Sequence, residues 1–383
     1  MTPARILVAG GGPVGLAFAC AYGGGEVRVL EATAAPAPTG EAFDVRIYAL
    51  SSGSRSFLRD IGAWEHLDAA RVAPVRRMEV FGDGNAKLAF SGRAGSPLAW
   101  IVEAGRLGAA LEAHAATLPH VTITRSAPAR QAGASAAGAW AELESGERID
   151  GDLIVAADGP DSQVRALLGI EAVQQPYEET AIVANFEVEH SHGDIARQWF
   201  RADGVLAWLP LPGRRISIVW SAAAAEAARI AELDERALER RVREAGAAVL
   251  GDLRLVSRVA TFPLRLVRVA QPVAEGAAVI GDAAHAVHPL AGQGVNLGFQ
   301  DARVLAETLA ERTPLERPGD LRVLRRYARA RREDVSAMQF VTDRLDKLFA
   351  SEAPGASWLR NTGLQAVDSQ PWLKSALASR AMR

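Results

Sequence analysis

The sequence predicts a mixed α/β fold in which a domain built on a parallel sheet is interrupted by an antiparallel sheet. Two observations carry this prediction. In the first and last thirds of the chain, at residues 5–22 and 279–311, apolar runs lead into glycine-rich turns and then into helical patterns. Between them, residues 180–219 alternate apolar and polar positions, as strands with one buried face do.

The first predicted group of elements is a β-α-β unit. Residues 5–9 form an apolar run typical of a buried parallel strand. An apolar helix is predicted at 13–22, where Pro13 suits the first turn because its missing N–H costs little there. The glycines at 23–25 end this helix, and residues 26–31 form the second strand. The unit spans about 30 residues, as a β-α-β motif does.

The next stretch alternates loops, helices and short strands. A Pro/Ala-rich loop is predicted at 33–40, and a hairpin at 77–90 turns at Asp83-Gly84-Asn85. Residues 126–138 are low in complexity and are predicted to form a surface turn. The other elements predicted here are helices at 51–61 and 107–116 and strands at 139–143 and 153–156.

The pattern changes at residue 180. The strands predicted for the antiparallel sheet lie at 182–188, 198–200, 206–209 and 216–220. The elements predicted after them are a helical stretch at 222–247, strands at 254–266 and 279–280, and long helices at 294–311 and 321–349. Because elements of the parallel type flank the alternating segment, we expect the antiparallel sheet to be an insertion into one domain.

Composition and charge exclude several classes of function. The 383 residues carry a formal net charge of −2 with no basic block, so no nucleic-acid partner is expected. The single Cys20 cannot form an internal disulfide, which fits a reducing compartment, and its apolar surroundings predict a small buried residue. No apolar run reaches the ~18 residues of a membrane-spanning helix, and the first residues lack a signal-peptide pattern. We expect a cytoplasmic protein that touches a membrane at most at its surface.

The first glycine-rich turn fits the G-x-G-x-x-G pattern of a dinucleotide-binding loop. Gly10 permits the tight turn, Gly12 lets the backbone approach a pyrophosphate, and Gly15 lets helix and strand pack closely. The helix that follows offers free N–H groups and the positive end of its dipole to phosphates. Glu31 lies 21 positions after Gly10 and suits hydrogen bonding to a ribose diol, which disfavours NADP at this site. The motif predicts FAD or NAD; a tight turn with an incidental glutamate is the alternative.

Two further apolar strands end in an acidic residue. Asp158 opens a strand-to-helix turn, which by itself is more typical of an ordinary Asp-Gly turn capped by Ser162 than of a cofactor site. Asp282 follows the strand at 279–280 and suits hydrogen bonding to a sugar-like chain. The segment 292–296 opens a long helix, and a helix N-terminus stabilises an anionic group such as a reduced flavin ring.

Taken together, these motifs resemble the class A flavoprotein monooxygenases, and within them the ubiquinone-biosynthesis hydroxylases. The motifs are GGGPVG at 10–15, Glu31, ADGPDSQVR at 157–165, GDAAH at 281–285 and HPLAGQGVNLGFQDA at 288–302. Segments 200–220 and 360–374 also look like that subfamily, so the likeness covers essentially the whole chain. It implies a Rossmann-like FAD-binding domain interrupted by an antiparallel-sheet substrate domain, as in para-hydroxybenzoate hydroxylase, with C-terminal helices.

The resemblance implies the following domain boundaries. The FAD-binding domain comprises 1–73, 98–176 and 271–340, and the substrate domain comprises 74–97 and 177–270. Residues 341–383 form a C-terminal helical segment. In the tail at 372–383, a solvated helix is expected, with contact to a membrane surface as the alternative.

The resemblance also assigns cofactor roles to individual residues. Gly10, Gly12, Gly15 and Glu31 are implied to hold the ADP half of FAD, and Arg46 to approach the flavin side. Asp158 is implied to support the pyrophosphate region and nicotinamide use, and Asp282 to bind the ribityl chain. The residues implied to line the isoalloxazine ring are Pro289, Gly292, Gly294, Val295 and Asn296. No catalytic base is identified; the flavin-facing loop with Pro289, Gly292 and Gly294 is the segment assigned to the chemistry.

One position departs from the family pattern. Relatives commonly carry Asn, Gln or Arg two or three residues before the helix predicted near residue 107, and this chain has Ala104 there. A cofactor contact is therefore expected to be missing, with Glu103 and Arg106 as the open alternatives for replacing it.

The histidines and tryptophans admit other roles. His285 and His288 have no carboxylate or cysteine at ligand spacing, so they are expected to shape the loop, and no metal site is predicted. His190 and His192 are predicted to be exposed turn residues. Two roles are equally expected for Trp199, Trp208 and Trp220: lining an aromatic pocket, or packing in the core.

The implied activity is FAD-dependent hydroxylation of an aromatic ring by molecular oxygen through a flavin C4a-hydroperoxide. The implied substrate is a lipophilic polyprenylated phenol or quinone precursor of ubiquinone. Because the chain has no second G-x-G-x-x-G, NAD(P)H is expected to bind transiently as electron donor. The alternatives are a hydroxylase of another aromatic small molecule, a reductase or halogenase on the same fold, and a flavin-bound accessory protein of a biosynthetic complex.

Overall fold

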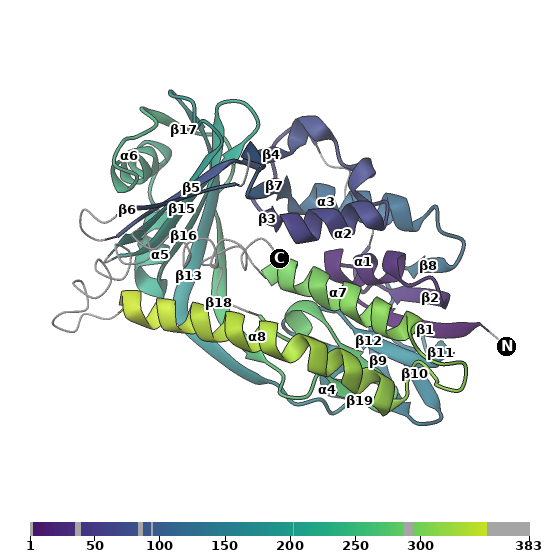
Figure 1. Ribbon diagram of the computed structural model, residues 1–383. Coiled ribbons are helices and arrows are strands. Elements are labelled where there is room, and N and C mark those ends of the chain that lie inside the picture. The colour runs from purple at the N-terminus through teal and green to yellow at the C-terminus, as the bar shows by residue number, and fades with distance from the viewer. Residues whose placement is uncertain are drawn as a thin grey trace.

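The computed structural model describes residues 3–34, 40–82, 87–92, 95–201, 203–286 and 294–350, with side chains up to Gln339 in the last helix. Figure 1 shows two sheets side by side, each with its own helices. The parallel sheet and helices α1, α2, α3 and α7 lie at the right, and the larger sheet with α5 and α6 lies at the left. The predicted mixed α/β fold is confirmed.

The parallel sheet has the strand order β19-β20-β12-β1-β2-β8. β1 (Ala4–Ala9) lies between β2 (Gly25–Leu30) and β12 (Leu153–Ala156) and pairs parallel with both. The outer strands are β8 (Val121–Thr124), β20 (Ala277–Val279) and β19 (Val273–Ala274), of which β19 is antiparallel to its neighbour. β12 and β20 are buried at every position, as expected for strands covered on both faces.

One face of this sheet carries the helices. α1 (Pro13–Ala21) packs between α3 (Ala104–Ala115) and α7 (Gly294–Ala310), and α2 (Ser52–Asp60) lies against α7. α8 (Leu321–Ala350) packs on α7 and runs along the base of the molecule (Figure 1). α8 continues without a break through residue 341, where the C-terminal segment was expected to begin, and residues 351–383 lie outside the described residues.

The other face is covered by a three-stranded sheet and a short helix. The strands are β9 (Ala129–Ser135), β10 (Gly138–Leu143) and β11 (Arg148–Gly151), and the helix is α4 (Gln163–Leu167). The surface turn predicted at 126–138 is therefore wrong for most of its length, because β9 occupies it. The alanines of β9 pack against the core, and small side chains give no strand signal in the sequence.

The larger sheet has the order β17-β13-β16-β15-β14-β5-β6, with β18 also paired to β13. Its strands are β5 (Arg77–Phe81), β6 (Lys87–Ser91), β13 (Val173–Val188), β14 (Ile195–Arg201), β15 (Gly204–Leu211), β16 (Arg215–Ala223), β17 (Leu253–Leu255) and β18 (Ala260–Arg268). The β5–β6 hairpin is confirmed, although its predicted turn lies outside the described residues. The sheet is not wholly antiparallel as predicted, because β5 pairs parallel with β14.

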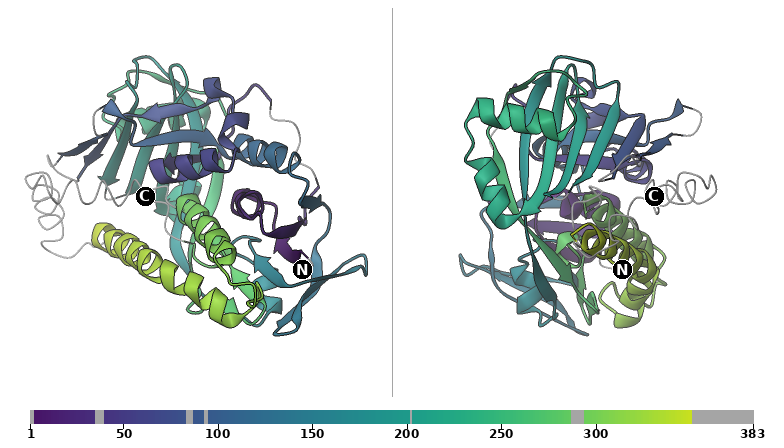
Figure 2. Two further views of the ribbon diagram at one scale, coloured as in Figure 1. Left: turned by 45° about the vertical axis from the view of Figure 1, so that its right-hand side comes forward. Right: turned by 90° about the vertical axis from the view of Figure 1, so that its left-hand side faces the viewer.

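Two helices cover the outer face of this sheet, as the right-hand view of Figure 2 shows. They are α5 (Ala224–Ala231) and α6 (Glu235–Ala245), so the helical stretch predicted at 222–247 is confirmed, with a break at 232–234. The break has a local cause: the Asp234 side chain accepts a hydrogen bond from Ala237 N at 2.8 Å and caps α6. The core between this sheet and these helices contains Trp199, Trp208 and Trp220. Of their two expected roles, core packing is therefore the one that the structure supports.

A small sheet lies between the two larger ones (Figure 1). It consists of β3 (Ile47–Ser51), β7 (Ala99–Glu103) and β4 (Ala73–Val75), with the short 3₁₀ helices η1 (Trp64–His66) and η2 (Ala69–Arg71) nearby. The prediction for His192 is wrong: the residue is buried, and its Nε2 lies 3.0 Å from Leu211 O and 2.9 Å from Gly213 O. His190 is exposed as predicted. In the described part of the chain, no helix is long and apolar enough to cross a membrane.

Candidate cofactor site

Three turns meet at the carboxyl edge of the parallel sheet. They follow the neighbouring strands β1, β12 and β20, and backbone hydrogen bonds continue the strands into them: Ala157 N donates to Ala9 O at 2.8 Å, and Ile280 N to Ala156 O at 3.0 Å. Gly10, Asp158 and Asp282, far apart in the sequence, are thereby brought to one edge of the sheet. This edge is where α/β sheets bind nucleotides and other ligands.

The three glycines of the first turn differ in what surrounds them. Gly10 has a φ of +107°, and a Cβ there would lie 2.4 Å from Ala157 O. A Cβ at Gly15 would lie 2.1 Å from Gly10 O, so these two glycines are required for packing. A Cβ at Gly12 would meet nothing within 4 Å. Gly12 is also the N-cap of α1 and offers no capping side chain, so open space lies beside a free helix N-terminus.

Glu31 holds the glycine loop by hydrogen bonds to its carboxylate. Gly11 N donates to Oε2 at 2.6 Å, and the backbone N and hydroxyl of Thr33 donate to Oε1 at 2.8 and 2.7 Å. Burial raises the pKa of Glu31, but the bonds from Thr33 and Gly11 outweigh burial and leave this pKa below its usual value. The ionised carboxylate has about four acceptor positions, so Oε2 can accept a further donor such as a ribose hydroxyl. No sequence motif indicated a role for Thr33.

The Asp158 carboxylate closes its own turn. Its Oδ2 accepts from Val164 N at 3.0 Å, and its Oδ1 accepts from the Ser162 hydroxyl, which also caps α4 by accepting from Arg165 N at 3.0 Å. This is the capped Asp-Gly turn that the sequence offered as the alternative. Arg165 is buried, and its Nη1 donates to Ala283 O at 2.6 Å, which ties the second turn to the third. Sequence reasoning missed this link, because only the fold brings the two turns together.

The third turn faces the start of α7. Asp282 lies in the 3₁₀ helix η4 (Gly281–Ala283), and a Cβ at Gly294 would lie 3.6 Å from Asp282 Oδ1. Burial raises the pKa of Asp282, and the charges of His285 and Arg46 oppose that rise. Arg46 is exposed, and its guanidinium carbon lies 5.5 Å from the centre of the Tyr48 ring. Asp282, Arg46 and the N-terminus of α7 therefore lie near one another.

The Asn296 side chain joins α7 to the small sheet. Its Oδ1 accepts from Ser51 N at 2.9 Å and from the Ser54 hydroxyl at 2.7 Å, and its Nδ2 donates to Ala49 O at 2.9 Å. Asn296 and Val295 are both buried, so their side chains pack the start of the helix. The first turn of α7 can present its backbone N–H groups to a ligand instead. Pro289 and Gly292 lie outside the described residues.

A buried ion-pair group holds the segment before Arg46. Glu103 is 2% exposed; it accepts two hydrogen bonds from Arg71 at 2.8 and 2.7 Å and pairs with Arg106 at 3.1 Å. Glu103 also accepts from Asp44 N at 2.8 Å. α3 begins at Ala104 itself, three residues before the predicted helix start, so Glu103 and Arg106 flank that start. Glu103 and Arg106, the two residues expected to replace a contact at Ala104, thus form an ion pair with each other.

His285 takes part in a buried group behind the third turn. Its Nε2 lies 2.5 Å from Asp301 Oδ2, which also accepts from Gly281 N at 2.9 Å. Asp301 Oδ1 accepts from Arg331 Nε at 2.7 Å, so one carboxylate joins η4, α7 and α8. Burial lowers the pKa of His285, but the Asp301 carboxylate outweighs burial and raises it above its usual value. His285 therefore shapes the turn, as predicted, whereas His288 lies outside the described residues.

The geometry fits FAD, and comparison with known proteins decides the family. A family model described as an FAD binding domain matches residues 3–341. The chain belongs to this FAD-binding family. It is 34% identical to 3-demethoxyubiquinol 3-hydroxylase of Escherichia coli K12, over 97% of this chain and 96% of that protein. It is also 34% identical to ubiquinone hydroxylase UbiL of Rhodospirillum rubrum, over 99% of this chain and 89% of that protein.

A solved structure supports the fold alone. The structure of Pseudomonas aeruginosa PqsL in complex with 2-aminobenzoylacetate has a TM-score of 0.77 with this chain at 22% identity, covering 95% of this chain and 99% of that one. Together with the relatives, it confirms the predicted FAD-dependent monooxygenase of the para-hydroxybenzoate-hydroxylase type. Within that family the chain belongs to the group of ubiquinone-biosynthesis hydroxylases.

Proposed function

We propose that this FAD-dependent monooxygenase hydroxylates an aromatic ring of a lipophilic ubiquinone precursor, with molecular oxygen as second substrate and NAD(P)H as electron donor. One observation carries the proposal: nearly the whole length of the chain matches 3-demethoxyubiquinol 3-hydroxylase of Escherichia coli at 34% identity. The relative UbiL of Rhodospirillum rubrum, a ubiquinone hydroxylase by name, adds a second match of the same extent.

The proposed ADP end of the cofactor site is the first turn. Gly12 leaves the open space that a pyrophosphate needs beside the N-terminus of α1, and Glu31 offers a free acceptor position to the ribose diol. Gly10 and Gly15 contribute by allowing the turn itself. Both carboxylate oxygens of Asp158 already accept hydrogen bonds within its turn. We therefore propose that Asp158 supports the pyrophosphate region indirectly, by holding the backbone of this turn.

The proposed flavin end is the third turn with the N-terminus of α7. We assign Asp282 to hydrogen bonds with the ribityl chain and Arg46 to the approach to the ring, and the charge of Arg46, which acts on the Asp282 carboxyl, supports this assignment. The backbone at Gly294 to Asn296 would stabilise negative charge on the ring. When bound, FAD supplies the activation of oxygen for ring hydroxylation; the protein supplies binding, orientation and exclusion of water. The ring-facing role of Pro289 and Gly292 stays a prediction.

The proposed physiological role is tested by deleting the gene and measuring quinone intermediates by mass spectrometry. The proposal expects an aromatic precursor to accumulate that lacks one ring hydroxyl and keeps its lipophilic tail. A plasmid copy of the wild-type chain should restore the hydroxylated product, and a Gly12→Asp copy, whose carboxylate occupies the pyrophosphate space, should not. An unchanged quinone profile in the deletion strain would contradict the proposal. Contact with a membrane surface and membership of a biosynthetic complex stay predictions.

A further inference from the structure

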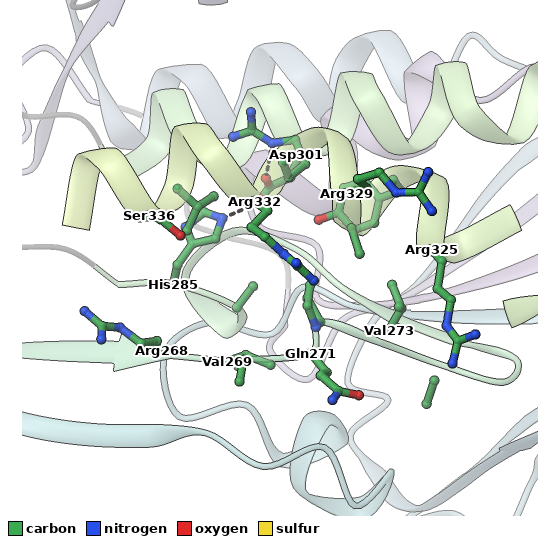
Figure 3. Close-up of a pocket in the computed structure, with 18 of the residues that line it drawn as sticks. Arg268, Val269, Gln271, Val273, His285, Asp301, Arg325, Arg329, Arg332 and Ser336 are labelled. Atoms are coloured by element: carbon green, nitrogen blue, oxygen red, sulfur yellow. Dashed lines mark hydrogen bonds and ion pairs between the residues drawn. The ribbon is translucent and has the colours of Figure 1, made fainter. Parts of the chain in front are cut away.

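A cavity lies between α8 and the chain segment at 268–275, and His285 and Asp301 also line it. Its volume is about 950 Å³, within the range of small-molecule sites. Figure 3 shows Arg325, Arg329, Arg332 and Ser336 along α8, and Arg268, Val269, Gln271 and Val273 across from them. None of the residues assigned to FAD lines this cavity.

The basic side chains of α8 that line the cavity form one row. Arg325, Arg329 and Arg332 are spaced by four and three residues, which places them on the same face of the helix. Among the described residues, none of the three pairs with a carboxylate. Arg326, on another face of α8, does pair, with Glu316 at 3.0 Å. Within the part of the chain that the structure describes, the positive charge of this row is therefore uncompensated.

The rest of the lining adds little negative charge. Arg268 lies across from the row, and its Nε donates to Gln339 Oε1 at 3.1 Å. Of the two carboxylates, Asp301 is already bonded to Arg331 and His285. Glu275 belongs to the segment 268–275, and its Oε1 accepts a hydrogen bond from Leu321 N, at the start of α8, at 3.5 Å. Among the described lining residues, apart from the bonded pair of Asp301 and Arg331, four arginines thus face one carboxylate, so the cavity favours an anion.

The floor of the cavity holds an unsatisfied polar atom. His285 is 4% exposed, and its Nδ1 has no hydrogen-bond partner in the part of the chain that the structure describes. Buried polar atoms in native proteins nearly always find a partner, so an orphan in a cavity wall indicates a bound group. Because Nε2 bonds to the Asp301 carboxylate and the pKa of the imidazole is raised, Nδ1 is set to donate a hydrogen bond toward an anion or its water.

We propose that this cavity binds a phosphate-bearing anion through Arg325, Arg329 and Arg332. The planar guanidinium presents a fork of N–H donors that matches phosphate oxygens, which favours phosphate over simpler anions. The apolar lining, with Val269, Val273 and Val335, accepts the carbon part of such a ligand. A soluble phosphoester and a phospholipid headgroup share this chemistry. The site goes beyond the proposed hydroxylation and does not depend on it.

The experiment uses the full chain loaded with FAD, so that the cofactor's own pyrophosphate site is filled. Pyrophosphate is titrated by calorimetry, and vesicles of phosphatidylglycerol in phosphatidylcholine are tested by co-sedimentation against phosphatidylcholine alone. The proposal expects one of these probes to bind, and the one that binds identifies the source of the phosphate. Failure of both probes to bind would overturn it.

Matched variants locate the binding. Arg329→Gln/Arg332→Gln removes two charges from the row and should weaken binding about tenfold or more. Arg322→Gln/Arg326→Gln removes the same charge from the same helix next to Glu316 and should bind as the wild type does. Both variants are first checked for an unchanged flavin spectrum and unfolding temperature. Equal weakening in the two variants would show a general charge effect and overturn the assignment.

Discussion

At the scale of single residues, the glycine loop separates packing from ligand binding. A Cβ at Gly10 would lie 2.4 Å from a backbone oxygen, and a Cβ at Gly15 would lie 2.1 Å from one. A Cβ at Gly12 would enter open space. The sequence motif assigns all three to one cofactor, yet the structure divides them into two that shape the turn and one that leaves room beside it. Substitutions can therefore distinguish the two roles.

Gly12→Ala should leave the fold intact and weaken FAD binding. The backbone at Gly12 is extended, with φ of −71°, so alanine fits without strain, and its methyl group would enter the space proposed for the pyrophosphate. We expect FAD affinity to fall about tenfold or more at an unchanged unfolding temperature of the apoprotein. Gly10→Ala is the counterpart and should cost about 2 kcal/mol or more of stability, because its φ is +107°. Equal FAD affinity of Gly12→Ala and wild type would exclude the proposed pyrophosphate position.

Glu31 makes stability depend on pH in a predictable direction. Its pKa in the folded state lies below the reference value of 4.5, because bonds from Thr33 and Gly11 outweigh burial. A lowered folded-state pKa contributes stability that is fully present above the unfolded pKa and is lost as pH falls through the folded value. Glu31→Gln should therefore unfold more easily than wild type in urea at neutral pH, with the difference shrinking at about pH 3.

The control is Glu26→Gln, which changes an exposed glutamate of β2, the strand that ends just before Glu31. It should match the wild type at both pH values, because an exposed side chain without a fixed partner contributes little to stability. A Glu31→Gln difference that does not vary with pH would contradict the assignment.

At the scale of elements, one buried carboxylate holds three segments together. Asp301 bonds to the third turn through Gly281 N, to His285 and to Arg331 of α8. Asp301→Asn should lower the free energy of unfolding by about 3 kcal/mol, because it leaves two buried cationic groups without their counter-charge. Chemical unfolding followed by flavin release and by circular dichroism measures this change.

The matched control for Asp301 is on the same helix. Arg303→Gln removes an exposed pair with Glu307 at 3.3 Å and should cost less than about 0.5 kcal/mol. A loss below about 1 kcal/mol for Asp301→Asn would mean that the buried group does not hold the third turn.

Elements were predictable from sequence where the signal is local. The apolar strand, glycine turn and helix at the N-terminus follow from short-range periodicity and from residues with special backbone preferences. The strand β9 was missed because its alanines resemble a low-complexity loop, and the break before α6 was missed because one capping aspartate ends the helical pattern. The bonds of Asp301 to Arg331 and of Arg165 to Ala283 join residues that only the tertiary fold brings together.

At the scale of the whole molecule, the type of topology was predictable from the sequence, whereas the pairing of individual strands was not. An insertion of antiparallel strands between parallel elements follows from their order in the sequence. The parallel pairing of β5 with β14 does not, because it joins strands more than a hundred residues apart. The domain boundaries implied by the family resemblance stay a prediction. No sequence motif indicated the proposed anion cavity between α8 and residues 268–275, because its row of arginines has the pattern of an ordinary solvated helix face.

The central claim is that this chain transfers an oxygen atom from molecular oxygen to an aromatic ring. It is tested most directly with purified, FAD-loaded protein, NAD(P)H, a lipophilic phenolic precursor and isotopically heavy oxygen gas, with the product analysed by mass spectrometry. We expect a ring-hydroxylated product that carries one heavy oxygen atom, formed only when both substrate and reduced nicotinamide are present. A product labelled from water, or consumption of oxygen to hydrogen peroxide without any ring product, would contradict it.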